Sequence, residues 1–231
     1  MAILVPMRSA AQPYPHASDG TEIEDLKDAL RRSIRQARTA RSPRRRTEAG
    51  LALADVVETI PEIAEASCVS VYASRPGEPD TGPLLERLAA RGVRVLLPVL
   101  GTGLQRDWAE YAGADDLRQR APGRPPEPGT PTLGAEAIAE AEVVVAPALA
   151  VDTRGTRLGQ GGGWYDRALL HARPGVRVVA LVFPEELYDA DVRPLPREAH
   201  DRTVDAVATP EGWHCLRTED VGRHAPLRPV D

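Results

Sequence analysis

The stretch from Arg157 to Arg167 concentrates the residue types in this chain that suit a phosphorylated ligand. It reads RLGQGGGWYDR and holds four glycines within five positions: Gly159, Gly161, Gly162 and Gly163. Glycine costs conformational entropy on folding, so a cluster needs a reason, and close approach of backbone to a ligand is the commonest one. Successive N–H groups followed by a helix N-terminus bind anions, and Arg157 adds a bidentate cation. The stretch therefore predicts a polyphosphate site.

Two common phosphate motifs do not fit this cluster. No Lys-Ser or Lys-Thr pair follows Gly163, which excludes a Walker loop. The sixth position counted from Gly159 is Trp164, which excludes a dinucleotide fingerprint. Asp166 falls in the first turn of the helix expected after the glycines, where it would suit a Mg²⁺ ion beside bound phosphates. The helix dipole alone also favours a carboxylate there, and for this residue taken by itself that structural explanation is the better one.

A second group of charges precedes the glycines by more than a hundred residues. Lys27, Arg31, Arg35 and Arg38 recur at spacings of four, four and three, which places them on one helix face. Lys27 is the only lysine among the 29 basic residues, and no acidic residue lies between positions 29 and 47. Three interpretations stay open: a nucleic-acid contact, a nucleotide contact by Lys27 and Arg31 alone, or a solvated charged face.

Two further segments carry candidate polar groups. Glu78 lies in the turn RPGEPDT after an apolar run, where its carboxylate could accept hydrogen bonds from the N–H groups of a heterocycle. The run PREAHD holds Glu198, His200 and Asp201 before a short strand. A metal-binding Asp201 or a catalytic His200 are both possible, although a histidine in a loop is more often structural. No CxxC or HExxH motif is present, so zinc is not indicated.

The composition is that of a soluble globular protein. The 231 residues are 42% hydrophobic and 27% charged, with a net charge of −5 that gives no general attraction to nucleic acid or anionic membranes. Cys68 and Cys215 are too few for a disulfide framework and suit a reducing compartment. No apolar run approaches the roughly 20 residues of a membrane helix, and no basic segment precedes the apolar start. We therefore expect a cytoplasmic protein.

The order of predicted elements indicates one α/β domain over residues 21–213. Residues 1–20 resemble a loose arm, residues 214–231 a polar tail, and the segment 113–131 a long surface loop that could act as a lid. Thr21 and Glu24 fit a capping box for a helix to about residue 41, and Ser42-Pro43 fits the start of a second helix. The remaining elements are strands near 69–72, 93–97, 107–111 (an edge), 143–146, 176–183 and 204–208, and helices near 83–91 and 163–172.

Strands that alternate with helices predict a mostly parallel sheet covered on both faces, a three-layer α/β/α sandwich. Ligands bind such sheets at the carboxyl ends of the strands. The glycine cluster follows the strand at 143–146 by about a dozen residues, so we expect it on that side.

Taken together, these residues resemble the 5-formyltetrahydrofolate cyclo-ligase (methenyltetrahydrofolate synthetase) family over about residues 24–212. The string RLGQGGGWYDR is the most specific match. Supporting matches follow in the same order along the chain: KDALR at 27–31, VYASRPGEPDT at 71–81, LLPV at 96–99, EP at 127–128, APALAVD at 146–152 and PREAHD at 196–201. The resemblance implies a single α/β/α domain.

The resemblance also implies an activity: the ATP-dependent conversion of 5-formyltetrahydrofolate to 5,10-methenyltetrahydrofolate, with release of ADP and phosphate, in a monomer that needs Mg²⁺. The residues implied to contact ATP are Lys27, Arg31, Arg157, Gly159, Gly161, Gly162, Gly163, Trp164 and Tyr165. Those implied to contact the folate are Ala73, Glu78, Gln160 and Trp164. Asp166 and Asp201 would hold Mg²⁺, and the catalytic contributions would come from Lys27, Arg157 and Asp166.

The sequence departs from the family pattern at three places. Trp164 stands where a tyrosine is expected, which should preserve stacking, Pro79 stiffens the turn at Glu78, and an RPP run precedes Glu127. Two other functions compete with the cyclo-ligase. One is an α/β enzyme acting on a sugar phosphate or an acyl-CoA. The other is a nucleic-acid-binding protein that uses the arginine-rich helices at 27–46, for which a steep salt dependence of binding would be diagnostic.

Overall fold

The computed structural model describes residues 12–15, 20–101 and 106–216 of the chain. Most of the predicted arm at 1–20 and all but the first residues of the predicted tail at 214–231 lie outside the described residues. Within the described ranges, no helix is both long and apolar enough to cross a lipid bilayer.

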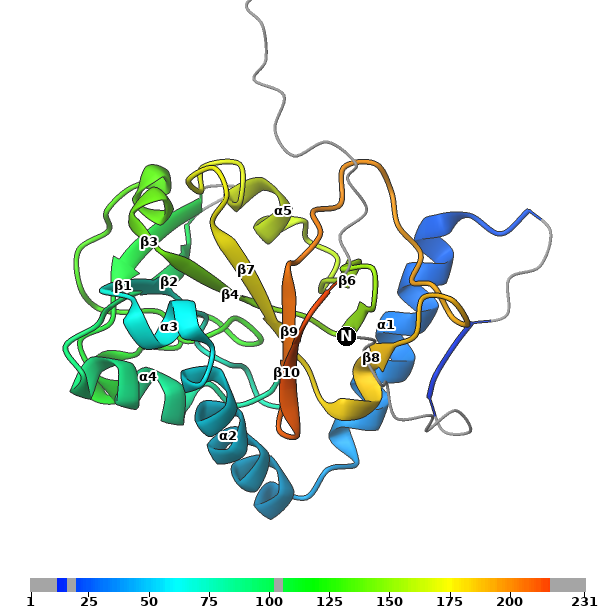
Figure 1. Cartoon of the computed structure of the whole chain (residues 1–231), viewed down its shortest axis with the longest axis horizontal. Coiled ribbons are helices and arrows are strands. Elements are labelled where there is room, and N and C mark those ends of the chain that lie inside the picture. Colours follow the sequence, from blue (N-terminus) through cyan, green and yellow to red (C-terminus); the bar gives the residue numbers. More distant parts are fainter. Residues whose placement is uncertain (1–11, 16–19, 102–105, 217–231) are drawn as a thin grey trace, which may run out of the picture.

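The centre of the fold is a seven-stranded sheet in the order β10-β9-β7-β4-β1-β2-β3 (Figure 1). The five inner strands are parallel, and β3 and β10 pair in the antiparallel sense at the two edges. The mostly parallel sheet and its edge strand near residues 107–111 are thereby confirmed. Its strands are β1 (Cys68–Ser70), β2 (Arg94–Leu100), β3 (Arg106–Glu110), β4 (Val143–Pro147), β7 (Arg177–Leu181), β9 (Ala206–Thr209) and β10 (Gly212–Cys215).

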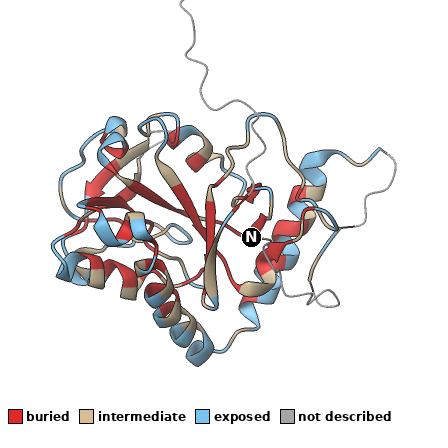
Figure 2. Ribbon diagram, in the orientation of Figure 1, coloured by how far each residue is buried: buried red, intermediate tan, exposed pale blue. Residues whose placement is uncertain are grey.

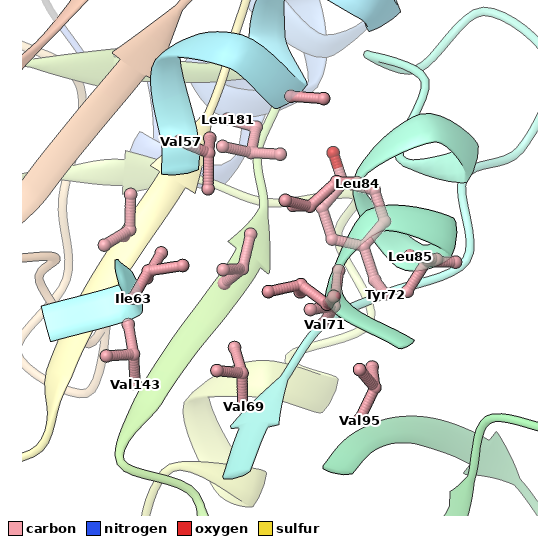
Figure 3. Close-up of a cluster of buried hydrophobic side chains, with 14 of the residues drawn as sticks. Val57, Ile63, Val69, Val71, Tyr72, Leu84, Leu85, Val95, Val143 and Leu181 are labelled. Atoms are coloured by element: carbon pink, nitrogen blue, oxygen red, sulfur yellow. The ribbon is translucent and has the colours of Figure 1, made fainter. Parts of the chain in front are cut away.

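Helices cover both faces of this sheet, and most of its strand residues are buried (Figure 2). Along β4 the side chains alternate: Val143 and Val145 belong to one buried cluster, and Val144 and Ala146 belong to the other. The first cluster is covered by α2 (Pro43–Glu58), α3 (Pro61–Glu65) and α4 (Gly82–Ala90), and Figure 3 shows their side chains meeting those of the strands. The second is covered by η2 (Ala135–Glu140) and α5 (Trp164–Ala168). The structure is therefore the three-layer sandwich that the sequence predicted.

A small second sheet, in the order β6-β5-β8, was not predicted. Its strands are β5 (Ala150–Asp152), β6 (Arg157–Leu158) and β8 (Leu187–Tyr188), and η3 (Pro184–Glu186) precedes β8. The helix α1 (Ile23–Thr39) packs on this sheet, since Leu30 and Ile34 share a buried cluster with Leu158 and Tyr188. This packing matters for function because it carries the basic face of α1 to the strand that leads into the glycine loop.

Several predicted boundaries are wrong. The capping box at Thr21 is off by one residue: Glu22 is the N-cap, and its side chain makes no capping hydrogen bond. The helix after the glycines ends at Ala168, because the chain turns before Pro174. Strand β10 crosses the predicted domain boundary at 213, so the domain extends at least to Cys215. By contrast, Ser42 caps α2 as predicted, accepting from the Arg45 N–H at 3.4 Å.

The segment 113–131 is attached to the body of the protein. It contains η1 (Ala114–Asp116), and the backbones of Arg118 and Glu127 exchange hydrogen bonds of 2.8 and 3.0 Å. The Glu127 side chain is buried and accepts from the Leu100 N–H at 3.0 Å. This contact fixes the segment to the end of β2, which explains how the RPP run before Glu127 is accommodated.

Candidate active site

The glycine loop lies between β6 and α5, next to the carboxyl end of β4. Arg157, the first residue of β6, donates to the Pro147 carbonyl at the end of β4 over 3.2 Å, which confirms the predicted side of the sheet. Gly161 has φ +104° and Gly163 has φ +56°. The first of these values is strongly unfavourable for any residue with a side chain, so glycine is required for the loop to take this path.

Arg31 of α1 packs directly on the loop. Its Nε donates to the Gly159 carbonyl at 3.2 Å, and a Cβ added to Gly161 would lie 3.4 Å from its Cζ. Its NH1 group also reaches Glu24 at 2.6 Å and Asp28 at 2.7 Å. This side chain brings the basic face of α1 into contact with the glycine loop, two segments that the family resemblance assigns to one ATP site.

Replacing Gly161 with alanine should lower the free energy of unfolding by about 1–3 kcal/mol, the usual cost of a strained backbone residue. The matched control is Gly162→Ala, because Gly162 has no positive φ and a Cβ there would meet nothing within 4 Å. Denaturant unfolding of the ligand-free proteins measures both. Equal losses in the two variants would contradict the argument from backbone conformation.

Arg157 and Asp166 form a shielded ion pair beneath the loop. The NH2 group of Arg157 donates to Asp166 Oδ1 at 2.9 Å, and the arginine side chain is only 3% exposed. The same Oδ1 accepts from the Arg202 N–H at 3.1 Å. Asp166 thus joins the start of α5 to the segment that follows PREAHD, which brings two of the predicted site segments together.

Lys27 binds two carboxylates of the PREAHD segment itself. Its Nζ donates to Glu198 Oε2 at 2.6 Å and to Asp201 Oδ2 at 2.7 Å. Burial lowers the pKa of Lys27, but the hydrogen bonds to the two carboxylates outweigh it and the net pKa lies above the ordinary value. Burial likewise raises the pKa of Asp201, and the Glu198 N–H and Lys27 reverse this, so that its pKa is lowered. Both groups are charged at neutral pH.

A cavity of about 750 Å³ opens beside the glycine loop. Gly161, Gly162 and Gly163 line it together with Asp166 and Asp201, so the two predicted metal ligands face the same space. Carboxylate oxygens beside room for phosphates are the donor set that Mg²⁺ prefers, and these residues therefore fit that ion. Ligand atoms of Glu198, His200 and Asp201 also lie within 4.8 Å of one another.

A second cavity of about 400 Å³ lies where Gln160 and Glu78 meet. Gln160 Nε2 donates to Glu78 Oε1 at 3.0 Å, and Arg75 holds the same carboxylate through its backbone N–H at 2.9 Å and its NH2 group at 2.8 Å. Two of the residues implied to contact a folate are thus adjacent. The wall is strongly basic, with Arg35, Arg38, Arg75 and Arg124. Ala73, also implied to contact the folate, is buried in the core cluster under α4 and is not among the lining residues.

Trp164 and Tyr165 form an aromatic cluster with Trp108 of β3. The Trp164 ring centroid is 5.2 Å from that of Trp108 and 5.0 Å from that of Tyr165, in edge-on arrangements. Neither Trp164 nor Tyr165 is among the residues that line the two cavities. In this conformation the tryptophan packs against the second buried cluster of the sheet.

Most of the basic face of α1 points into the protein, and Arg35 is its exposed member. Besides Lys27 and Arg31, Arg38 is buried and binds Glu186 at 2.7 and 2.8 Å, and Arg35 donates to the Gln160 carbonyl at 2.9 Å. A face engaged in this way is poorly placed to contact a nucleic-acid backbone. This arrangement favours the nucleotide-contact interpretation over the other two.

Sequence reasoning passed over Asp152, which is 1% exposed. Its Oδ1 accepts from the N–H groups of Arg154 and Thr156, at 3.0 and 2.9 Å, and its Oδ2 accepts from that of Leu195 at 3.1 Å. The carboxylate therefore fixes both the turn before Arg157 and the start of the PREAHD segment. The string DTRGT offered a signal, because Asp two residues before a turn commonly binds the turn's backbone.

Comparison with known proteins agrees with this geometry. Residues 23–210 match the 5-formyltetrahydrofolate cyclo-ligase family. A 5-formyltetrahydrofolate cyclo-ligase from Mycolicibacterium smegmatis is 40% identical over 148 residues, covering 62% of this chain and 73% of the relative. One from Escherichia coli K12 is 33% identical over 180 residues, covering 77% and 96%. The solved structure of a 5,10-methenyltetrahydrofolate synthetase from Aquifex aeolicus superposes with a TM-score of 0.69 at 24% identity, over 88% of this chain and 100% of the other, and supports the fold. The chain belongs to the 5-formyltetrahydrofolate cyclo-ligase family.

Proposed function

We propose that this protein converts 5-formyltetrahydrofolate to 5,10-methenyltetrahydrofolate at the expense of ATP, with release of ADP and phosphate. Family membership supports the reaction, and the site supports its two substrates. We expect the protein to act as a monomer, as the family resemblance implies. The competing sugar-phosphate or acyl-CoA enzyme receives no comparable support from the comparisons.

The observation that carries the proposal is the glycine loop between two cavities. Gln160 lines the smaller cavity, which contains Glu78, whereas Gly161 to Gly163 line the larger one, which contains three aspartates and four arginines. ATP in the larger cavity and a folate in the smaller one would approach each other across one turn of backbone. Positioning of this kind is the main contribution that a protein makes to phosphoryl transfer.

The chemistry needs no nucleophilic side chain. The formyl oxygen of the substrate attacks the γ-phosphorus and ADP leaves; N10 then attacks the formyl carbon, phosphate leaves with that oxygen, and N10 loses its proton. Arg157, Lys27 and the loop N–H groups would stabilise charge on the transferring phosphoryl group. Asp166 and Asp201 would hold Mg²⁺, which when bound neutralises charge on the phosphate oxygens.

The basic wall of the smaller cavity suits the carboxylates of a folate's glutamate. Arg35 donates to the backbone carbonyl and side-chain oxygen of Gln160, and Arg124 NH1 donates to the Leu100 carbonyl at 2.8 Å. Within the described part of the chain, neither guanidinium group forms an ion pair with a carboxylate, and their hydrogen bonds are to neutral oxygens. Guanidinium groups bind carboxylates in bidentate fashion, so the wall favours an anionic tail.

The proposal is tested by incubating the protein with 5-formyltetrahydrofolate and recording the absorbance of methenyltetrahydrofolate. Product should form with ATP and Mg²⁺ together and not when either is withheld. Product formation without ATP, or its absence under all conditions, would reject the assignment.

Glu78→Gln should raise KM for 5-formyltetrahydrofolate about tenfold, because a charged hydrogen bond to the ligand becomes a neutral one. KM for ATP should change little, since Glu78 faces the smaller cavity. Steady-state kinetics with each substrate varied in turn provides the measurement. A larger effect on ATP than on the folate would exclude Glu78 from the folate site.

A further inference from the structure

Lys27 has more negative partners than a phosphate-binding lysine requires. Its ammonium is bound to Glu198 and Asp201 at 2.6 and 2.7 Å, and Glu24 Oε2 lies 3.9 Å away. The lysine side chain is 5% exposed, and Lys27 is not among the residues that line the large cavity. In this state its charge is paired with the two carboxylates, one of which, Asp201, separates it from the space assigned to the triphosphate.

The two carboxylates are not equivalent. Asp201 lines the large cavity and can face either Lys27 or a cation bound there, whereas Glu198 is not among the lining residues. Asp201 Oδ2 also accepts from the Glu198 N–H at 2.8 Å, so the carboxylates are held side by side around the ammonium. The nearest cationic group to the Glu198 carboxylate is the Lys27 ammonium, at 2.6 Å. His200 Nε2 lies farther away, at 4.0 Å.

We propose that Glu198 is a positioning residue that competes with the triphosphate for Lys27, so that ATP gains this lysine efficiently only when a cation occupies Asp201. The inference rests on the proposed function. Without a cation, a phosphate must draw Lys27 away from two partly buried carboxylates, Glu198 (35% exposed) and Asp201 (16% exposed), and these lose the cation that they share, which is unfavourable. A divalent cation at Asp201 repels the ammonium and removes one competitor, so that cation and nucleotide assist each other's binding.

The first test measures ATP affinity by calorimetry in the presence of EDTA and again with excess Mg²⁺. Glu198→Gln should bind Mg²⁺-free ATP roughly tenfold more tightly than the wild type, because one charged competitor for Lys27 is gone. The increase in ATP affinity that Mg²⁺ produces should be smaller in Glu198→Gln than in the wild type by a similar factor. Glu48→Gln on α2 is the matched control, since it changes the net charge equally at an exposed pair with Arg44. It should leave both affinities unchanged.

A second measurement uses the fact that Lys27 is the only lysine in the sequence. In protein grown with [ε-¹⁵N]lysine, the side-chain ammonium gives one NMR signal. We expect that signal to shift strongly when a non-hydrolysable ATP analogue is added with Mg²⁺, and to shift less when the analogue is added with EDTA. In Glu198→Gln the two shifts should become similar.

The outcomes separate this inference from the proposed function. Unchanged or weaker binding of Mg²⁺-free ATP by Glu198→Gln overturns the inference. Tighter binding without any shift of the Lys27 signal also overturns it, because Glu198 would then act only by repelling the triphosphate. A specific loss of Mg²⁺-supported affinity would make Glu198 a metal ligand and also overturns it. If the wild type binds ATP with Mg²⁺ but forms no methenyltetrahydrofolate, the proposed function fails whatever Glu198→Gln does.

Discussion

The Asp166→Ala protein is expected to remain folded and to lose turnover by roughly 10²–10³-fold, the range seen when one group that stabilises transferring charge is removed. Asp166 contributes twice. It faces the large cavity, where it would hold Mg²⁺, and its Oδ1 receives both Arg157 and the Arg202 N–H. Without Asp166, the Arg157 guanidinium loses its ion pair and keeps its hydrogen bond to the Pro147 carbonyl, so its orientation is less well fixed.

The absorbance assay at saturating substrates measures this loss, and circular dichroism checks the fold. Asp166→Asn separates the two contributions, because an amide oxygen can still accept from Arg157 but binds Mg²⁺ poorly. If Mg²⁺ ligation dominates, the asparagine variant should be nearly as inactive as the alanine variant and require more Mg²⁺. Near-normal turnover in Asp166→Ala would remove this residue from the phosphoryl site.

The parts of the fold that the sequence predicted are those with continuous apolar runs. The strands β1, β2, β4 and β7 are buried on both faces, which produces runs of valine and leucine that stand out from the helices around them. Strands β5, β6, β8 and β10 span only two to four residues each and include polar positions such as Asp152 and Arg157. Segments this short have no measurable periodicity, so the second sheet could not be predicted.

The site was predicted in its parts but not in its connections. The glycine loop, Lys27 and the PREAHD segment were recognised separately. That Lys27 binds Glu198, 171 positions away, depends on α1 packing against the unpredicted small sheet. Trp164 illustrates the same limit, since its ring position depends on Trp108 of the edge strand β3. Long-range side-chain contacts of this kind follow from tertiary packing and leave no local pattern in the sequence.

Lys27→Ala should lower kcat/KM for ATP about a hundredfold while changing KM for the folate by less than about threefold. A charged hydrogen bond to phosphate contributes about 1.5–3 kcal/mol, and each 1.4 kcal/mol is a factor of ten. The lysine lies by the large cavity's Asp201 rather than by Glu78 and Gln160, which explains the expected selectivity. Steady-state kinetics with each substrate varied in turn measures both effects.

Lys27→Arg is the informative companion to the alanine variant. Arginine keeps the charge but presents a planar fork instead of a compact ammonium, and the site holds Nζ between two carboxylate oxygens at 2.6 and 2.7 Å. If charge alone were needed, arginine would restore most of the ATP affinity. We expect it to restore only a small part, because the longer side chain cannot occupy the same point between Glu198 and Asp201. Equal losses for ATP and the folate in Lys27→Ala would instead mean that the lysine supports the whole fold, and would remove it from the nucleotide site.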